Sequence, residues 1–511
     1  MKKTLAILLL AAVAFGAKAQ GYQDAFRYSQ QFPVGTARTV AMGNAFTALG
    51  CDLGAMGINP ASTALYNCCE FAVTPALTFN STNSETGYSN PSNQDARGTK
   101  FGIPNVSVVF AMPTGRTDKL VSWSFGVGLN KVNNFNSHIS YAGQDGTSSL
   151  LGNIACGLEG IPSSVVNASD GYDAGNLPWQ SLLAWDNYLV DVLYEDETTA
   201  EYLGATENLY DDGIGVGGDL HKSFDRVTSG AIYNVQMNFG FNFSDELYLG
   251  ANVNVYTVDY GEERLYSEIA DKAGDYTSGF NGMSYGYWQE TTGSGINLQL
   301  GLIWVPFPAV RFGATYTTPT AYTLSDQWAE SMASDFNANN SFGYESSKKT
   351  VYPDYPYSYQ VKSPARFSLG AAFVLGNRGL VSVDYEHVDY SATRIRDEKG
   401  YDGTFMSDNA VLKTFNPCDI VRVGAEFNVN SALALRAGYN SYMFPDPEYQ
   451  FLSFGFGTKL SETAGLDLAF RTNLGATYTS QPYTDYAGIS VVGANVKEYN
   501  REVLLTYKVK F

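Results

Sequence analysis

The last ten residues of the chain alternate between two kinds of side chain. Every second residue is apolar, namely Val503, Leu505, Tyr507, Val509 and Phe511. The residues between them are polar or charged, with the single exception of Leu504. Because successive side chains of a β-strand point to opposite faces, this segment has an apolar face and a polar face. Such a strand is typical of a transmembrane β-barrel, which faces lipid outside and water inside.

Fourteen segments carry this alternation. Their approximate ranges are 69–80, 104–112, 120–130, 231–243, 247–261, 295–305, 310–322, 359–375, 380–390, 419–430, 432–442, 451–460, 465–477 and 500–511. Tight connections follow the even-numbered segments and long ones follow the odd-numbered segments, as in barrels with short periplasmic turns and long outer loops. We therefore predict an all-β fold, an up-and-down antiparallel transmembrane barrel of 14 strands over residues 68–511.

The amino terminus predicts the compartment. Lys2 and Lys3 precede an apolar run, and Ala17-Lys18-Ala19 has the small residues of a signal-peptidase site. Residues 1–19 are therefore interpreted as a signal peptide, and the mature chain would begin at Gln20. Together with the strand pattern, this predicts an integral barrel in the outer membrane of a Gram-negative bacterium, in contact with outer-membrane lipid.

Composition excludes several other classes of protein. Beyond residue 20 no run approaches the roughly 18 apolar residues of a membrane helix. The formal charge of −19 becomes −22 when three lysines leave with the signal peptide, which argues against a nucleic-acid partner. The cysteines have no zinc-type spacing and predict no metal site; they form at most one bridge, and they are Cys51, Cys68, Cys69, Cys156 and Cys418.

The longest predicted loop, residues 143–230, is strongly acidic. It carries 15 acidic residues against Lys222 and Arg226. Pro178 is expected to open a helix whose apolar stripe comprises Leu182, Trp185, Leu189 and Leu193. Two interpretations remain open: the stripe packs on the barrel rim, or it forms an extracellular apolar groove that captures a ligand. The acidic loop also leaves open a protein partner at the extracellular loops.

Residues 20–67 do not alternate and predict a plug, or hatch, inside the barrel. They contain Met42-Gly43-Asn44-Ala45-Phe46 and the turn Asn59-Pro60-Ala61. Small residues and an Asn-Pro turn let backbone pass close to the barrel wall. The hatch residues singled out are Gly43, Asn59, Pro60 and Ala61.

At these residues the chain resembles the FadL/TodX family of outer-membrane transporters for hydrophobic compounds. The family's hatch has a small-residue stretch followed by Asn-Pro-Ala, and residues 37–48 and 59–61 have this form here. Segments 249–253, 311–316 and 363–370 are similar to that family's strand starts. The individual motifs are loose, and their order along fourteen strands is what makes the resemblance specific.

The resemblance implies passive transport of hydrophobic small molecules, such as long-chain fatty acids or aromatic hydrocarbons. In this family the ligand binds outside, passes above the hatch and leaves sideways into the bilayer through a gap at a kinked third strand. Gly126 and Gly128 in that strand are the residues expected to permit the bend, since glycine weakens a strand. The alternatives are a polar porin, which a plug disfavours, and a non-transporting scaffold for secreted partners.

The sequence predicts no catalytic site and no cofactor. Its histidines are His138, His221 and His387, and none is paired with a nucleophile in the pattern of a hydrolase. A haem-capturing barrel, with His138, His387 or a tyrosine as axial ligand, is kept as an alternative. The acidic residues Asp384 and Glu386 are expected to form ion pairs with Arg366 or Arg422 rather than to run acid/base chemistry.

Overall fold

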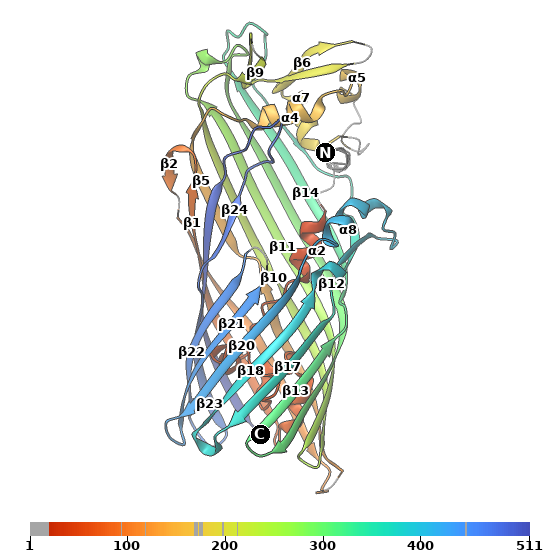
Figure 1. Cartoon of the computed structure of the whole chain (residues 1–511), viewed down its shortest axis with the longest axis vertical. Coiled ribbons are helices and arrows are strands. Elements are labelled where there is room, and N and C mark those ends of the chain that lie inside the picture. Colours follow the sequence, from red (N-terminus) through yellow and green to blue (C-terminus); the bar gives the residue numbers. More distant parts are fainter. Residues whose placement is uncertain are drawn as a thin grey trace.

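Fourteen strands form a closed antiparallel ring, which confirms the predicted barrel (Figure 1). The computed structural model describes residues 20–93, 95–117, 119–167, 172, 177–196, 199–211, 213–444 and 447–511. The predicted signal peptide, residues 1–19, lies outside these residues. In order around the ring the strands are β1 (Glu70–Thr86), β3 (Ala96–Pro113), β4 (Leu120–Asn134), β10 (Leu220–Phe243), β11 (Leu247–Ala270), β12 (Phe280–Phe307), β13 (Val310–Thr317), β17 (Arg366–Val374), β18 (Gly379–Asp389), β20 (Pro417–Asn428), β21 (Leu433–Met443), β22 (Tyr449–Lys459), β23 (Ala464–Asn473) and β25 (Ala494–Lys510).

β1 and β25 close the ring, from Glu70 opposite Lys510 to Thr86 opposite Ala494. Side chains alternate as predicted: Arg422 on β20 is 4% exposed and faces the lumen, whereas its neighbour Val423 is 37% exposed and faces outward. One face of each strand meets lipid and the other meets the lumen, so apolar and polar residues alternate along the sequence of these strands. Among the described residues, no helix is both long and apolar enough to cross a membrane.

Several strands are much longer than a membrane requires. β10 and β11 have 24 residues each and β12 has 28, whereas about 9–11 residues cross a bilayer. The outward face of these strands changes from apolar to charged at Asp259, Glu263 and Glu290. Their upper halves therefore rise above the apolar band. Figure 1 shows this tall part of the wall on one side, where β11, β12 and β14 reach the top.

Two predicted strands are interrupted. The segment 310–322 ends as β13 at Thr317, and a new strand, β14 (Ala321–Phe336), begins after a break and pairs with the upper part of β12. The segment 359–375 divides at Pro364, a residue that cannot donate to a ladder, into β16 (Tyr357–Lys362) and β17. The remaining strands of the wall are β2 (Ser89–Asn93), β5 (Ser137–Asp145), β15 (Ser347–Val351), β19 (Arg394–Asp397) and β24 (Ala476–Ser480).

The acidic loop folds into a cap at the top of the barrel (Figure 1). Its elements are α4 (Leu150–Leu158), α5 (Ser163–Val166), α7 (Trp179–Asp186) and the hairpins β6 (Val190–Glu195) with β7 (Ala200–Gly204) and β8 (Glu207–Tyr210) with β9 (Gly213–Val216). The other connections between strands contain α8 (Met406–Leu412), η3 (Ala273–Asp275), η4 (Gly376–Arg378), η5 (Tyr390–Ala392) and η6 (Gly403–Phe405). The cap shares one hydrophobic core with the upper ends of β10, β11, β12 and β14.

The amino-terminal segment, residues 20–66, lies inside the ring, where Figure 1 shows it in red. Here it is called the hatch segment. It comprises α2 (Tyr22–Ser29), α3 (Ala37–Ala41), η1 (Leu53–Gly57) and η2 (Pro60–Leu65). Thr36 caps α3 and Asn59 caps η2, and both side chains accept a backbone N–H from the first turn. These caps let short helical turns persist in a segment that lies almost wholly in contact with the wall.

Candidate functional site: the hatch segment, the lumen and the wall beside them

The backbone of the hatch segment packs directly against glycines on the inner wall. A Cβ at Gly424 or Gly438 would collide with Met42 and Gly43, and Gly43 itself has φ +62. Asn59 and Pro60 occupy a similar position at Gly250 and Gly301. Without a Cβ, the wall can approach another backbone closely. The sequence-predicted hatch residues Gly43, Asn59, Pro60 and Ala61 are therefore brought together with wall glycines.

Amide side chains of the wall hold the carbonyl groups of the hatch segment. Asn238 Nδ2 donates to the Pro60 carbonyl oxygen at 2.9 Å, and Asn252 Nδ2 donates to that of Met56 at 2.8 Å. Gln299 Nε2 donates to the carbonyl of Gly57 at 3.2 Å. These donors satisfy buried backbone groups that have no regular ladder of their own.

An ion pair joins Arg38 of the hatch segment to the wall. Arg38 Nε lies 2.9 Å from Glu426 Oε2, and Glu426 also binds Arg436 at 2.6 Å. As predicted, Glu386 pairs with two arginines, Arg366 at 2.9 Å and Arg422 at 2.7 Å. Asp384 does not join them, because its Oδ2 accepts the Thr47 backbone N–H at 2.8 Å. That carboxylate therefore holds the hatch segment and is not an acid/base partner of Glu386.

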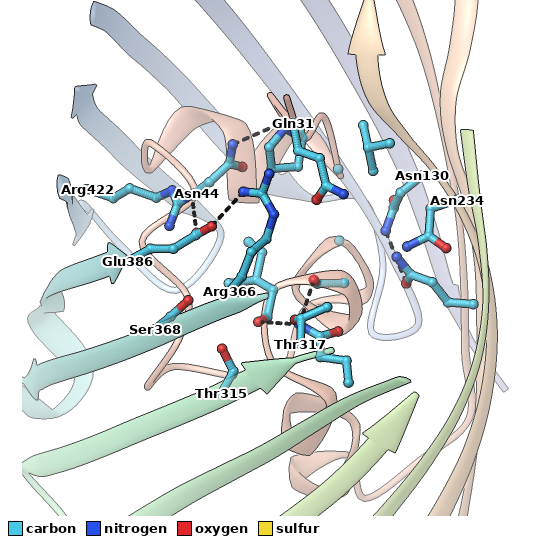
Figure 2. A pocket seen from close by; sticks show the side chains of 18 of the residues that line it. Gln31, Asn44, Asn130, Asn234, Thr315, Thr317, Arg366, Ser368, Glu386 and Arg422 are labelled. Carbon is cyan, nitrogen blue, oxygen red and sulfur yellow. Dashed lines mark hydrogen bonds and ion pairs between the residues drawn. The ribbon is translucent and has the colours of Figure 1, made fainter. Parts of the chain in front are cut away.

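Between the hatch segment and the wall, the lumen holds a polar cavity of about 60 Å³ (Figure 2). Its lining combines the Glu386 ion pairs with amide and hydroxyl groups, which include Gln31, Asn44, Asn130, Asn234, Thr315, Thr317 and Ser368. Asn130 Nδ2 donates to Gln236 Oε1 at 3.3 Å on the opposite side of the cavity from the ion pairs. The cavity is too small and too polar to hold a long apolar ligand.

The wall comes apart between β3 and β4. The two strands pair only from Pro113 opposite Ser122 up to Asn105 opposite Asn130. Above that row β3 stays with β1 as far as Ala96, whereas β4 stays with β10 as far as Asn134. Residues 96–104 of β3 thus have a free edge among the described residues. Here this separation is called the window, bounded by residues 96–104 of β3 and 131–136 of β4 and its continuation.

Open space lies on both sides of the free edge. A Cβ at Gly98 or Gly102 would meet no atom within 4 Å, although these residues face inward. Phe101, on the outward face, is 69% exposed. A cavity of about 180 Å³ lies on the inner side and is lined by Phe32, residues 133–137 and the inward residues of β22, β23 and β25. Apolar and aromatic groups line this cavity beside amides and arginines.

The hatch segment takes the place of the missing strand on β4. The N–H of Phe32 donates to the Val132 carbonyl at 2.7 Å, and that of Val34 donates to the Lys131 carbonyl at 2.8 Å. Lys131 Nζ then reaches Glu502 of β25 at 3.2 Å. The inner side of the window is therefore closed by a short β-bridge and an ion pair rather than by a barrel strand.

Gly126 and Gly128 lie below the window. Both are in regular register with β3 and β10, whereas the irregularity in β4 comes at residues 131–133. A Cβ at Gly128 would lie 2.7 Å from Met56 Cε of the hatch segment, and one at Gly126 would lie 3.1 Å from Met56 Sδ. Bulky residues at these positions would therefore press on the Met56 side chain of the hatch segment, and the bend that the sequence led us to expect here is absent from this part of β4. Pro104 and the mostly polar stretch at residues 130–134 are the sequence features that could have indicated the window.

A second charged cluster joins α2 to the tall part of the wall. Glu262 lies 3.0 Å from Arg226 Nη2, and it also binds Arg264 and Arg27. Burial favours the neutral acid, but Arg226, Arg264 and Arg27 hold the pKa of Glu262 well below its ordinary value. An adjoining cavity of about 150 Å³ is lined by Arg27, Arg226, Phe135, Tyr260 and Tyr478, among others. It shares Arg27 and Phe135 with the cavity at the window.

The predicted apolar stripe of the acidic loop is not a groove. The helix ends at Asp186, Tyr188 has φ +58, and Leu193 belongs to strand β6. Leu182 and Leu189 are 3% and 0% exposed in the core of the cap, with Trp185 packed against them. The continuous helix is wrong, because a sharp turn ends it, and its leucines stabilise the cap instead of facing a ligand.

The histidines lie on the outer surface. His138 is 2.9 Å from Asp225, His221 is 3.0 Å from Asp271, and His387 is 2.8 Å from Asp419. Each is at least 40% exposed. Within the described ranges, no cluster of His, Cys, Asp and Glu is arranged to hold a metal ion. A haem held in the lumen by His138 or His387 finds no support in this placement, because none of the three histidines faces the lumen.

Comparison with known proteins identifies the architecture. No family model and no curated protein matches the sequence. Among solved structures, the toluene transporter TodX of P. putida superposes with a TM-score of 0.53 at 14% identity, over 93% of this chain and 98% of that chain. A FadL homologue of Pseudomonas aeruginosa has a TM-score of 0.53 at 11% identity, over 94% of this chain and 100% of its own. The chain therefore has the fold of these barrels.

Proposed function

We propose that this protein is an outer-membrane channel for hydrophobic small molecules. In this proposal the chain is processed after Ala19 and inserted in the outer membrane. The ligand enters from outside, meets the cavities beside Arg27 and Phe32, and leaves through the window into the outer leaflet. The name of one structural neighbour, a toluene transporter, agrees with such a ligand.

The observation that carries the proposal is the separation of β3 from β4 above a lumen occupied by the hatch segment. A strand edge without a partner is costly inside a bilayer, so a barrel without a use for it would be expected to close the ladder. The axial route is obstructed by a segment bound through wall glycines and amides. A lateral exit also keeps an apolar solute out of water, which favours it by about 25 cal/mol per Å².

The ligand class follows from the cavities. The cavity at the window combines Phe32, Phe451 and Tyr449 with Arg27 and Arg471. Aromatic rings suit an apolar body, and guanidinium groups suit a polar or anionic end. A long-chain fatty acid and an aromatic hydrocarbon are therefore the two probes to compare, and preference for the fatty acid is expected.

Tryptophan at Gly98 and Gly102 tests the exit. Their side chains would extend into open space, so the double variant is expected to fold and to fill the window. Uptake of both probes by cells should then fall to the level of cells without the protein. Gly403→Trp is the matched control, because Gly403 also has nothing within 4 Å of a Cβ but lies in the loop element η6.

Folding of each variant is checked by heat-modifiable migration on gels. Unchanged uptake of both probes by a well-folded Gly98→Trp/Gly102→Trp variant would rule out the window as the exit. A non-transporting scaffold would then be the better account, since the cap offers a large folded surface outside the barrel.

A further inference from the structure

Three cationic side chains lie together on the outer surface of the wall, next to the window. They are Arg97 of β3 and Lys497 and Arg501 of β25. β1 lies between these strands: Phe79 is opposite both Arg501 and Thr99, and Ser81 is opposite both Tyr499 and Arg97. Neighbouring strands are about 4.8 Å apart, so long side chains from β3 and β25 can reach a common point over β1. We call these three residues with Tyr499 the basic cluster.

The charges of the basic cluster are available to a ligand. The Arg97 side chain is 80% exposed, and its nearest acidic partner, Asp95, is 3.9 Å away and 54% exposed. Such an exposed pair is weak. Lys497 and Arg501 form no ion pair among the described residues; instead both contact the ring of Tyr499, at 5.5 and 5.4 Å from its centroid. Tyr499 therefore holds two positive charges side by side.

The basic cluster lies at the edge of the apolar band. A depression of about 650 Å³ on the outer face is lined by Phe79, Arg97, Tyr499 and Arg501, among others. One row lower, Leu77 is opposite Phe101 and Val503, and Leu77 and Phe101 are 42% and 69% exposed. Positive charge thus stands directly above apolar side chains, as the head group and acyl chains of a membrane lipid would require.

This charge is not a general property of the surface. The chain as a whole carries a formal charge of −19. On the tall part of the wall, the outward residues of β11 and β12 include Asp259, Glu263 and Glu290. An anionic ligand would therefore be repelled by the tall part of the wall and attracted to the basic cluster beside the window.

We propose that the basic cluster binds the phosphate-bearing head group of an outer-leaflet lipid. Arg97, Lys497 and Arg501 contact the phosphate, because guanidinium and ammonium groups pair with phosphate oxygens, and the acyl chains lie along Leu77 and Phe101. The lipid would border the free edge of β3. This inference rests on the outer-membrane location but not on transport, so a failed uptake experiment would leave it intact.

Native mass spectrometry of the full-length protein, released from detergent, tests the inference. The probes are diphosphorylated lipid A and the same glycolipid without its phosphates. The protein should retain the phosphorylated lipid and not the other, and added salt should weaken the retention. In Arg97→Gln/Arg501→Gln, affinity should fall about 30-fold, at roughly a kcal/mol per cation. Lys348→Gln/Lys362→Gln, which removes two exposed cations elsewhere, should bind as the unaltered protein does.

Three results would overturn the inference. Equal retention of the two glycolipids would show that phosphate is not recognised. Complete displacement of the lipid by millimolar inorganic phosphate would assign the cluster to free phosphate. A change of oligomeric state in Arg97→Gln/Arg501→Gln, with lipid binding unchanged, would assign the surface to a second copy of the chain. The comparison of the two glycolipids uses the unaltered protein, so it tests phosphate recognition even if the double variant fails to fold.

Discussion

At the scale of single residues, the charges above the apolar band differ in how well they are matched. Glu262 serves three arginines, and its depressed pKa reflects that excess of positive charge. Glu330 is the opposite case. It accepts the Tyr285 hydroxyl at 2.9 Å, and burial raises its pKa to about 7. Glu262 anchors α2 of the hatch segment, whereas Glu330 lowers the stability of the folded protein whenever it is ionised.

Glu262→Gln should release α2. The substitution leaves Arg27, Arg226 and Arg264 without their shared carboxylate, and breaking a buried pair typically costs about 3–5 kcal/mol. Hydrogen exchange at residues 22–29 is expected to rise strongly while exchange in β20 to β23 stays unchanged. Equal protection of α2 in the variant and the unaltered protein would contradict this role for Glu262. Glu398→Gln, at an exposed loop position, is the control.

Glu330 makes stability depend on pH. Its folded pKa of about 7 exceeds the ordinary value of 4.5, so the folded state binds the extra proton between these values. Stability should therefore fall as pH rises from 4.5 to 7, by at most about 1.4 kcal/mol per pH unit, and level off above. Glu330→Gln should show a smaller decline than the unaltered protein. Parallel unfolding midpoints for variant and unaltered protein across pH 5 to 8 would show that Glu330 does not titrate in this range.

At the scale of elements, the wall and the hatch segment fit each other backbone to backbone. Gly438→Ala should displace residues 42 and 43, because the new Cβ would meet their backbone atoms, which cannot move aside as the end of a flexible side chain can. Overpacking of this kind costs about 1–3 kcal/mol. Protease cleavage within the hatch segment should become faster in Gly438→Ala but not in Gly98→Ala, where the Cβ has free space. Identical cleavage rates in the two variants would refute this fit.

The sequence predicted the parts of the barrel that lie between lipid and lumen. There the alternation is enforced on both faces, and all fourteen segments match strands of the ring. Above the bilayer the outward face meets water and the inward face meets the cap, so the contrast between the faces weakens and the extensions of β10 to β12 were missed. The helix from Pro178 was predicted too long, because Leu189 is buried by the cap core after a turn and not by helical packing.

The window was missed for a different reason. The sequence drew attention to the glycines of the third strand, yet Gly126 and Gly128 serve the close approach of Met56. The separation of β3 from β4 depends on where pairing stops, and single-strand periodicity carries no information about pairing partners. Pro104 and the polar pairs Asn130-Lys131 and Asn133-Asn134 could have signalled it, since proline and adjacent polar residues interrupt a strand that faces lipid.

At the scale of the whole molecule, the barrel has one obstructed axis and one incomplete side. The lower lumen is filled by the hatch segment, whereas the wall between β3 and β4 is completed only by the bridge from Phe32 and Val34 and by the Lys131 ion pair. In the proposed route, this bridge and ion pair separate a hydrophobic ligand in the cavity at Phe32 from the outer leaflet. The upper wall and the cap surround the approach from outside.

Photolabelling tests this account most directly. A long-chain fatty acid with a diazirine near its methyl end would be added from outside to vesicles that contain the protein, irradiated, and mapped by mass spectrometry of peptides. The account predicts labels on residues 97–103 of β3 and on residues 131–136 of β4 and its continuation. These labels should be lost in Gly98→Trp/Gly102→Trp and kept in Gly403→Trp. Labels concentrated instead at the periplasmic end, on residues 51–65 and around Arg311, would show axial passage and contradict lateral release.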